Sequence, residues 1–554
     1  MNNVSPFNSV TSLFQHLLNF KIRFGTVFIG SFIFYISCMW LGYCVYGDSP
    51  LANLSTVLLS SALGLIMVIA LWLGRDRSSF ELLCVLSYSM CLFFFPRLLQ
   101  YLLFRQEDLK TLYLLFPIHW TADDINKGLA YVVLGTLVLV IGLFLGGELF
   151  YKCSKHTVND QIESGVSIKL PSLLSIILAG VIIYFVDGYY TIYLGLSASS
   201  NCNFESIPYK WLTHIFSGDI YIFAVMALLG FHFKDLHFKY KLYLYLSLLV
   251  YIAYTLMLGS RGGILRLVII AFVVAVAIYR DPEIKVRTMI QAAIVVLILS
   301  ICSYLIGTEI RELKRYSCGD GIGETIREAA VSGIKSNIED GYATNHVFTD
   351  KYKSDPRNLE RPVFPIHVKK ILDRLGEIDY AIGIVAIKPN EAFKNEYINF
   401  RYILKNITNN VLPGTPYPEA QLMTNNMFPV LYRNLTMEHV KENFLSEPFT
   451  IWGLSFIFFG YVGGLLFILI SSISIQMLYL YISHKSEYFI KGGSYIFKAY
   501  FLWIVAGGAY FFTFGFDHAA LIFVYGFLEF VTTFSIIYSI DKLQPFFRTG
   551  TGSV

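Results

Sequence analysis

The chain carries a series of apolar runs, each about as long as a membrane-spanning helix. A helix needs about 20 mostly apolar residues to cross the hydrocarbon core of a bilayer. The 554-residue chain has a mean hydropathy of +0.57, and only 15% of its residues are charged, against about 25% in a typical soluble domain. The sequence therefore predicts an all-α polytopic membrane protein and excludes a disordered chain, a coiled coil and an ordinary soluble enzyme.

We expect about 12 transmembrane helices from these runs. Their ranges are 25–46, 51–73, 80–103, 128–150, 171–194, 214–232, 241–258, 263–279, 288–307, 452–481, 495–514 and 519–540. The eighth is short and carries Arg266, and the tenth is long enough to overshoot the membrane. Lys and Arg gather in alternate loops, and because cytoplasmic loops are enriched in both, both termini are predicted to be cytoplasmic.

Five parts follow from this topology. They are a cytoplasmic amphipathic segment (1–24), helices one to nine (25–307), a large periplasmic loop (308–449), helices ten to twelve (450–541) and a cytoplasmic tail (542–554). Apolar residues recur at helical spacing between Val10 and Leu18. This pattern fits a helix lying on the membrane surface or one packed against the protein itself.

The loop at 308–449 holds nearly half of the charged residues in the chain. A segment this long and this charged predicts a folded, mostly helical external insertion rather than a linker. It contains helical periodicity from Val368 to Ile382 and a Pro-rich turn at 411–418, which either lines a groove or only connects. Cys202 and Cys318 both fall on the expected outer side, and a disulfide between them is left open.

Several functions are not expected. The chain has no basic stripe with interleaved aromatic residues, so no nucleic-acid partner is predicted. It has no Cys-x-x-Cys and no clustered Cys and His, so no metal site is predicted. No cofactor is expected either.

Arginine at the membrane face gives the first candidate site. The stretch Gly259-Ser260-Arg261-Gly262-Gly263 joins two apolar spans. Glycines allow the backbone to approach a ligand closely, and a guanidinium binds phosphate through paired hydrogen bonds. The alternative is a simple turn with an arginine that reaches the interface. Arg97, behind Pro96 near the outer end of the third span, is a second candidate with the same alternative.

These features resemble a known family. The Gly-Ser-Arg-Gly-Gly stretch before a span and the long external loop are similar to those of O-antigen polymerases of the Wzy type and of O-antigen ligases. Arg261 to Leu265 reads as the short Arg-x-x-x-Leu pattern of these proteins. Arg374 to Asp379 resembles an Arg-x-x-x-x-Asp helix of oligosaccharide repeat-unit polymerases. Ser446 to Phe449, followed by Gly460 to Gly464, looks like their loop exit.

The resemblance implies an enzyme of the bacterial inner membrane. Such polymerases transfer a growing glycan from undecaprenyl diphosphate to the next lipid-linked repeat unit at the outer membrane face. The resemblance also implies a flippase and a chain-length regulator as partners. For this chemistry Arg97, Arg261 and Arg374 are the candidates for diphosphate binding, because the leaving group is anionic.

The general base is harder to choose. The predicted catalytic set is Arg261, Arg374, Asp379 and His518, with Asp379 and His518 as the candidate bases for the hydroxyl proton. Three further carboxylates lie in or near spans, namely Asp187, Asp219 and Glu529. An O-antigen ligase, or a flippase or other transporter for lipid-linked oligosaccharides, stays open as an alternative function.

Overall fold

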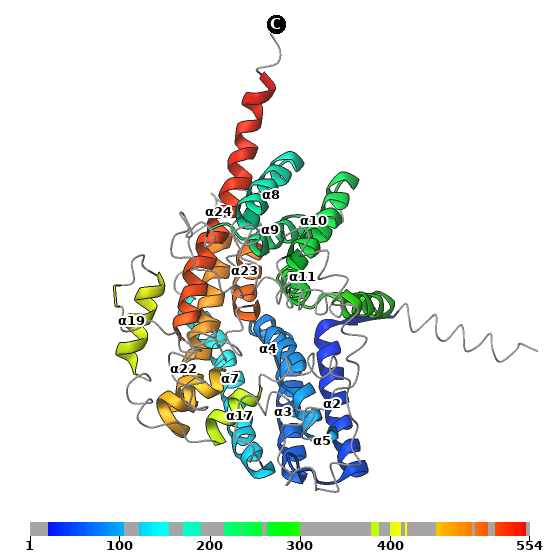
Figure 1. Ribbon diagram of the computed structural model, residues 1–554, viewed down its shortest axis with the longest axis vertical. Coiled ribbons are helices and arrows are strands. Elements are labelled where there is room, and N and C mark those ends of the chain that lie inside the picture. Colours follow the sequence, from blue (N-terminus) through cyan, green and yellow to red (C-terminus); the bar gives the residue numbers. More distant parts are fainter. Residues whose placement is uncertain are drawn as a thin grey trace, which may run out of the picture.

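A computed structural model gives the fold (Figure 1). It describes residues 20–104, 121–154, 170–189, 215–233, 235–257, 263–299, 378–386, 399–411, 416–417, 450–489, 494–507 and 516–549. Within these ranges the chain is mostly helical, and six helices are long and apolar enough to cross a membrane. The protein is therefore a multi-pass membrane protein.

The six long apolar helices coincide with expected spans. They are α2 (Phe24–Tyr46), α3 (Leu54–Gly74), the pair α4 (Phe80–Phe93) and α5 (Phe95–Leu103), α7 (Ala122–Ser154), α10 (Phe238–Met257) and α22 (Ile451–Phe489). Other helices cover the remaining expected ranges. They are α8 (Leu173–Gly188), α9 (Gly218–Phe231), α11 (Gly263–Tyr279), a segment at Val286–Leu299, α23 (Ser494–Gly507) and α24 (Phe516–Thr549). The count of 12 and the location of the termini stay predictions.

Two hydrophobic cores hold these helices together. The first includes buried residues of α2, α3, α4, α5, α7, α11, α22 and α23, among them Trp452 and Tyr101. The second is buried among α8, α9, α10, α11, α23 and α24 and contains Tyr221 and Phe223. Figure 1 shows α2, α3 and α5 at the lower end of the molecule and α8, α9 and α10 at the upper end.

A small sheet joins two distant segments of the chain. Strand β1 (Lys21–Arg23) pairs antiparallel with β2 (Glu283–Lys285), with Lys21 opposite Lys285. The expectation of helices alone misses this sheet, because three residues are too few to show the alternation that marks a strand. Nearby, Arg75 forms an ion pair with Asp281 at 3.6 Å. The segments at 21–23, 75 and 281–285 therefore lie together.

Helix α22 is longer than one membrane crossing, and its helical run is interrupted at one residue. Gly460 adopts φ 67° and ψ −163° inside the helical run Ile451–Phe489. A positive φ of this kind is readily adopted only by glycine. The overlong tenth span of the sequence is therefore two helical segments that meet at Gly460.

We expect Gly460→Ala to lower the free energy of unfolding by about 1 to 3 kcal/mol, because the combination of φ 67° and ψ −163° is essentially restricted to glycine. Gly30→Ala is the matched control, since Gly30 lies within helix α2 and a Cβ there meets nothing within 4 Å. It should be neutral or slightly stabilising. Thermal unfolding of the purified proteins in detergent measures both, and equal effects would contradict this explanation of the break.

Candidate functional site

Three polar side chains lie on one face of the short helix α5. Arg97, Gln100 and Tyr101 are spaced by three and four residues, which brings side chains together on a helix. The helix begins after a break at Phe94, and Pro96 lies in its first turn, where its missing N–H is tolerated. The apolar third span therefore ends in a separate helix with a polar face.

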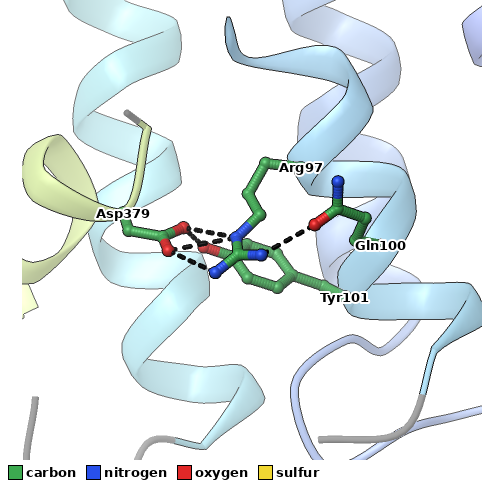
Figure 2. A network of polar contacts seen from close by, with 4 residues as sticks. All are labelled: Arg97, Gln100, Tyr101 and Asp379. Atoms are coloured by element: carbon green, nitrogen blue, oxygen red, sulfur yellow. Dashed lines mark hydrogen bonds and ion pairs between the residues drawn. The ribbon is translucent and has the colours of Figure 1, made fainter. Parts of the chain in front are cut away.

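Asp379 joins this face from the long charged segment (Figure 2). It is the second residue of α17 (Ile378–Ala386), where a carboxylate is favoured by the helix dipole. Arg97 Nε donates to Oδ1 and Oδ2 of Asp379 at 3.1 and 3.0 Å, and Nη2 donates to Oδ2 at 2.8 Å. The Tyr101 hydroxyl also donates to Oδ1. Arg97 Nη1 donates to Gln100 Oε1 at 2.7 Å.

The whole network is closed off from solvent. Arg97, Tyr101 and Asp379 are 0% exposed, and Gln100 is 2% exposed. Burying a charge is costly unless it is paired and hydrogen-bonded, and here each charge is matched by the other. The bidentate contact between guanidinium and carboxylate also fixes direction. The network therefore holds α17 against α5 in one defined position.

Packing holds α17 in the same place. It lies against α7 and α22, and Ile378, Ala381, Ile382 and Ile384 are all fully buried. A Cβ at Gly128 of α7 would lie 2.5 Å from the Ile382 Cα and carbonyl oxygen. Only a glycine allows the two backbones to approach this closely. Polar and apolar contacts together therefore insert part of the predicted external loop among the membrane helices.

This geometry suits positioning better than direct contact with a substrate. The hydrogen bonds of this network occupy all three guanidinium nitrogens of Arg97 and both carboxylate oxygens of Asp379. A diphosphate or a hydroxyl would have to displace the partner before it could bind. The predicted roles of Arg97 in diphosphate binding and of Asp379 in proton transfer stay predictions.

A second polar cluster lies in the other core. Asp219, in the first turn of α9, accepts hydrogen bonds from Arg266 Nη1 at 2.7 Å and from the Tyr251 hydroxyl at 2.6 Å. Asp187, near the end of α8, accepts one from the Gly218 N–H at 2.8 Å. Glu529 of α24 is close enough to interact electrostatically with both carboxylates. The structure thus brings together three carboxylates that the sequence offered separately.

The remaining predicted residues are only partly described. Arg261 and Arg374 lie outside the described residues, as do Cys202, Cys318 and the segment before residue 20. His518 lies in the first turn of α24. Among the described residues no three His, Cys, Asp or Glu side chains are grouped so that they could hold a metal ion.

Sequence reasoning missed four polar partners, namely Gln100, Tyr101, Tyr251 and Arg266. Gln100 and Tyr101 were detectable, because their spacing from Arg97 places them on the same helical face. Arg266 was noted only because a charged residue makes the eighth span a poorer candidate for a membrane helix. A charged residue inside a span is also a functional hypothesis by default. The side chain of Arg266 is 54% exposed, and this residue follows the Gly-Ser-Arg-Gly-Gly stretch by one helical turn of α11.

Comparisons with known proteins identify no relative. No protein-family model, curated protein or solved structure matches the chain. Its function has to be inferred from its own residues.

Proposed function

We propose that the protein polymerises lipid-linked oligosaccharide repeat units, such as those of an O-antigen or a capsule-like polysaccharide. In this proposal it acts at the outer face of the bacterial inner membrane. The observation that carries the proposal is the buried ion pair between Arg97 and Asp379. This ion pair attaches a helix of the long charged segment to a membrane helix. The substrate's lipid stays in the bilayer, so a loop that acts on this substrate has to be held at the membrane.

The proposed reaction breaks the bond between the glycan and undecaprenyl diphosphate and forms a glycosidic bond to a hydroxyl of the next unit. The diphosphate leaves with the bonding electron pair, so positive charge must stabilise it. The acceptor hydroxyl loses a proton, so a base must lie within hydrogen-bond reach. Both requirements can be met by side chains, and the proposal includes no metal and no cofactor.

The residues have the following roles in this proposal. Arg261 and Arg374 bind the diphosphate, and His518 is the candidate base. Arg97 and Asp379 hold α17 in position, which follows from their enclosed geometry. Arg266 lies directly after the Gly-Ser-Arg-Gly-Gly stretch. Its ion pair with Asp219 fixes the start of α11 against α9. A flippase would deliver the lipid-linked units, and a chain-length regulator would act with the polymerase.

A gel of the surface polysaccharide tests the proposal. The gene is deleted in the source bacterium, and the strain is complemented with the wild-type gene or with an empty vector. We expect the polymer ladder to collapse to a core that carries one repeat unit, because export and ligation of single units continue without a polymerase. Wild-type complementation should restore the ladder.

The other outcomes separate the alternative functions. If no repeat unit reaches the surface, the protein is not the polymerase. A lipid-linked glycan that accumulates in the outer leaflet then indicates a ligase, whereas accumulation in the inner leaflet indicates a flippase. An unchanged ladder would contradict all three functions.

A further inference from the structure

The two-stranded ribbon formed by β1 and β2 has two different faces. In an antiparallel pair, directly opposite residues point to the same face, and their neighbours along each strand point to the other. Ile22 lies opposite Ile284, and both are half-buried. Lys21 lies opposite Lys285, and both are exposed. The apolar face of the ribbon is therefore turned toward the protein, and the lysine face is turned away from it.

The ribbon is attached to the start of a membrane helix. Strand β1 leads directly into α2, and Figure 1 shows the blue start of α2 beside the green segment that follows α11. The Phe24 N–H donates to the Pro282 carbonyl at 3.2 Å, and the Val286 N–H donates to the Phe20 carbonyl at 2.9 Å. Backbone contacts at both ends of the ribbon therefore hold the two strands in one register.

Most of the charge around the ribbon is already paired. Three arginines each have a carboxylate partner, in the pairs Arg23–Glu283 (3.1 Å), Arg75–Asp281 (3.6 Å) and Arg77–Glu148 (3.8 Å). Lys21, Lys285 and Arg287 are exposed, and within the described part of the chain their side chains form no ion pair or hydrogen bond. The ribbon and the residue just beyond it therefore carry three uncompensated positive charges.

The two lysines form a pair that is unfavourable by itself. Like charges directly opposite each other in antiparallel strands are destabilising, because their Cβ atoms are only about 5 Å apart. Arg287 lies two residues beyond Lys285 and adds a third positive charge. An anion bound among the three would replace repulsion by charge-assisted hydrogen bonds. A phosphate group, with several acceptor oxygens, suits one guanidinium and two ammonium groups.

Apolar side chains lie beside these charges. Phe20, the residue before β1, is 63% exposed. The helical segment Val286–Leu299 begins where β2 ends. It exposes three apolar residues that share one helical face, namely Ile290, Ile294 and Leu297. Cations at the end of an apolar segment are typical of the level where lipid headgroups lie. A phosphate that carries acyl chains therefore matches this surface better than a free anion does.

We propose that the lysine face of the ribbon binds the phosphate of an anionic glycerophospholipid between Lys21, Lys285 and Arg287. The acyl chains then extend along the exposed apolar face of the segment Val286–Leu299. The site is made by the fold, because the two strands are 260 residues apart in the chain. A general excess of basic residues beside membrane helices would not place two lysines opposite each other. The site does not depend on the proposed polymerase activity.

Native mass spectrometry of the delipidated full-length protein tests the site. Titration with phosphatidylglycerol and, separately, with phosphatidylcholine of the same chains should show tighter retention of phosphatidylglycerol. Lys21→Gln should weaken this retention about five-fold, and Lys21→Gln combined with Lys285→Gln about 25-fold, because each removes one cation near the headgroup. Lys239→Gln is the matched control, since Lys239 is also an exposed lysine at the start of an apolar helix, α10. An equal effect of the control would overturn the proposal.

Lys21→Glu separates lipid binding from folding. It places opposite charges across the ribbon, so the free energy of unfolding in lipid-free detergent should not fall. Retention of phosphatidylglycerol should nevertheless fall by more than in Lys21→Gln, and unchanged retention would overturn the proposal. Inorganic phosphate in excess should not displace the lipid from the wild type. If it does, the ribbon recognises phosphate alone, and its assignment to a lipid is wrong.

Discussion

Asp379→Ala is expected to lower the free energy of unfolding by about 3 to 5 kcal/mol, because it leaves the Arg97 guanidinium buried without a counter-charge. Arg97 is 0% exposed, and its Nε and Nη2 donate only to Asp379 among the hydrogen bonds described above. Tyr101 loses its hydrogen-bond acceptor in the same substitution. Unfolding of the purified protein by denaturant in mixed micelles measures the change.

Replacing both partners should be far less harmful than replacing one. The pair Arg97→Met and Asp379→Leu removes both charges and keeps apolar volume, and such replacements are often close to neutral. Arg23 and Glu283 supply the matched control, because they form an ion pair at 3.1 Å with side chains 48% and 45% exposed. Arg23→Gln should change stability by less than about 1 kcal/mol. A similar small effect for Asp379→Ala would show that the network around Arg97 does not hold α17.

The double variant also separates positioning from catalysis. A stable double variant that still makes polymer would assign Arg97 and Asp379 a positioning role alone. A stable double variant without polymer would show that the charges themselves take part in the reaction. The proposed positioning role predicts the first result.

The membrane character of the chain could be predicted, but its internal pairing could not. Apolar runs of sufficient length identify α2, α3, α7 and α10, because bilayer thickness sets a minimum that few other helices reach. The break at Gly460 was not predictable, since glycine is also common within ordinary membrane helices. Nor do three-residue strands such as β1 leave a periodic signal.

The candidate site shows the same division. A charge in an apolar span implies a partner, so Arg97 qualifies as a candidate from the sequence. Asp379 became a candidate through the resemblance of Arg374 to Asp379 to an Arg-x-x-x-x-Asp pattern. Their pairing joins positions 282 residues apart, and one sequence carries no information on contacts of that separation. The family resemblance instead associated Asp379 with Arg374, five residues away, a spacing that does not place the two on one tight helical face. Tertiary packing of α17 against α7 and α22 brings Asp379 to Arg97.

Arg261→Ala is expected to abolish polymer while leaving the protein in the membrane at its normal level. The proposed reaction releases a diphosphate, and removing one group that stabilises such developing charge lowers a rate by about 100- to 1,000-fold. In the proposed reaction Arg261, in the Gly-Ser-Arg-Gly-Gly stretch, is the candidate to provide this charge. A gel of the surface polysaccharide from the complemented deletion strain should show a single repeat unit.

Two further variants make this result specific. Arg261→Lys keeps the charge but loses the planar fork that binds two phosphate oxygens at once, so it should restore only part of the ladder. Arg401→Ala is the control, because Arg401 is an exposed arginine of α19 (Phe400–Val411), within the segment predicted to be external. It should leave the ladder unchanged. Normal polymer length in Arg261→Ala would remove Arg261 from the site, and the ladder of the deletion strain would still decide separately whether the protein is the polymerase.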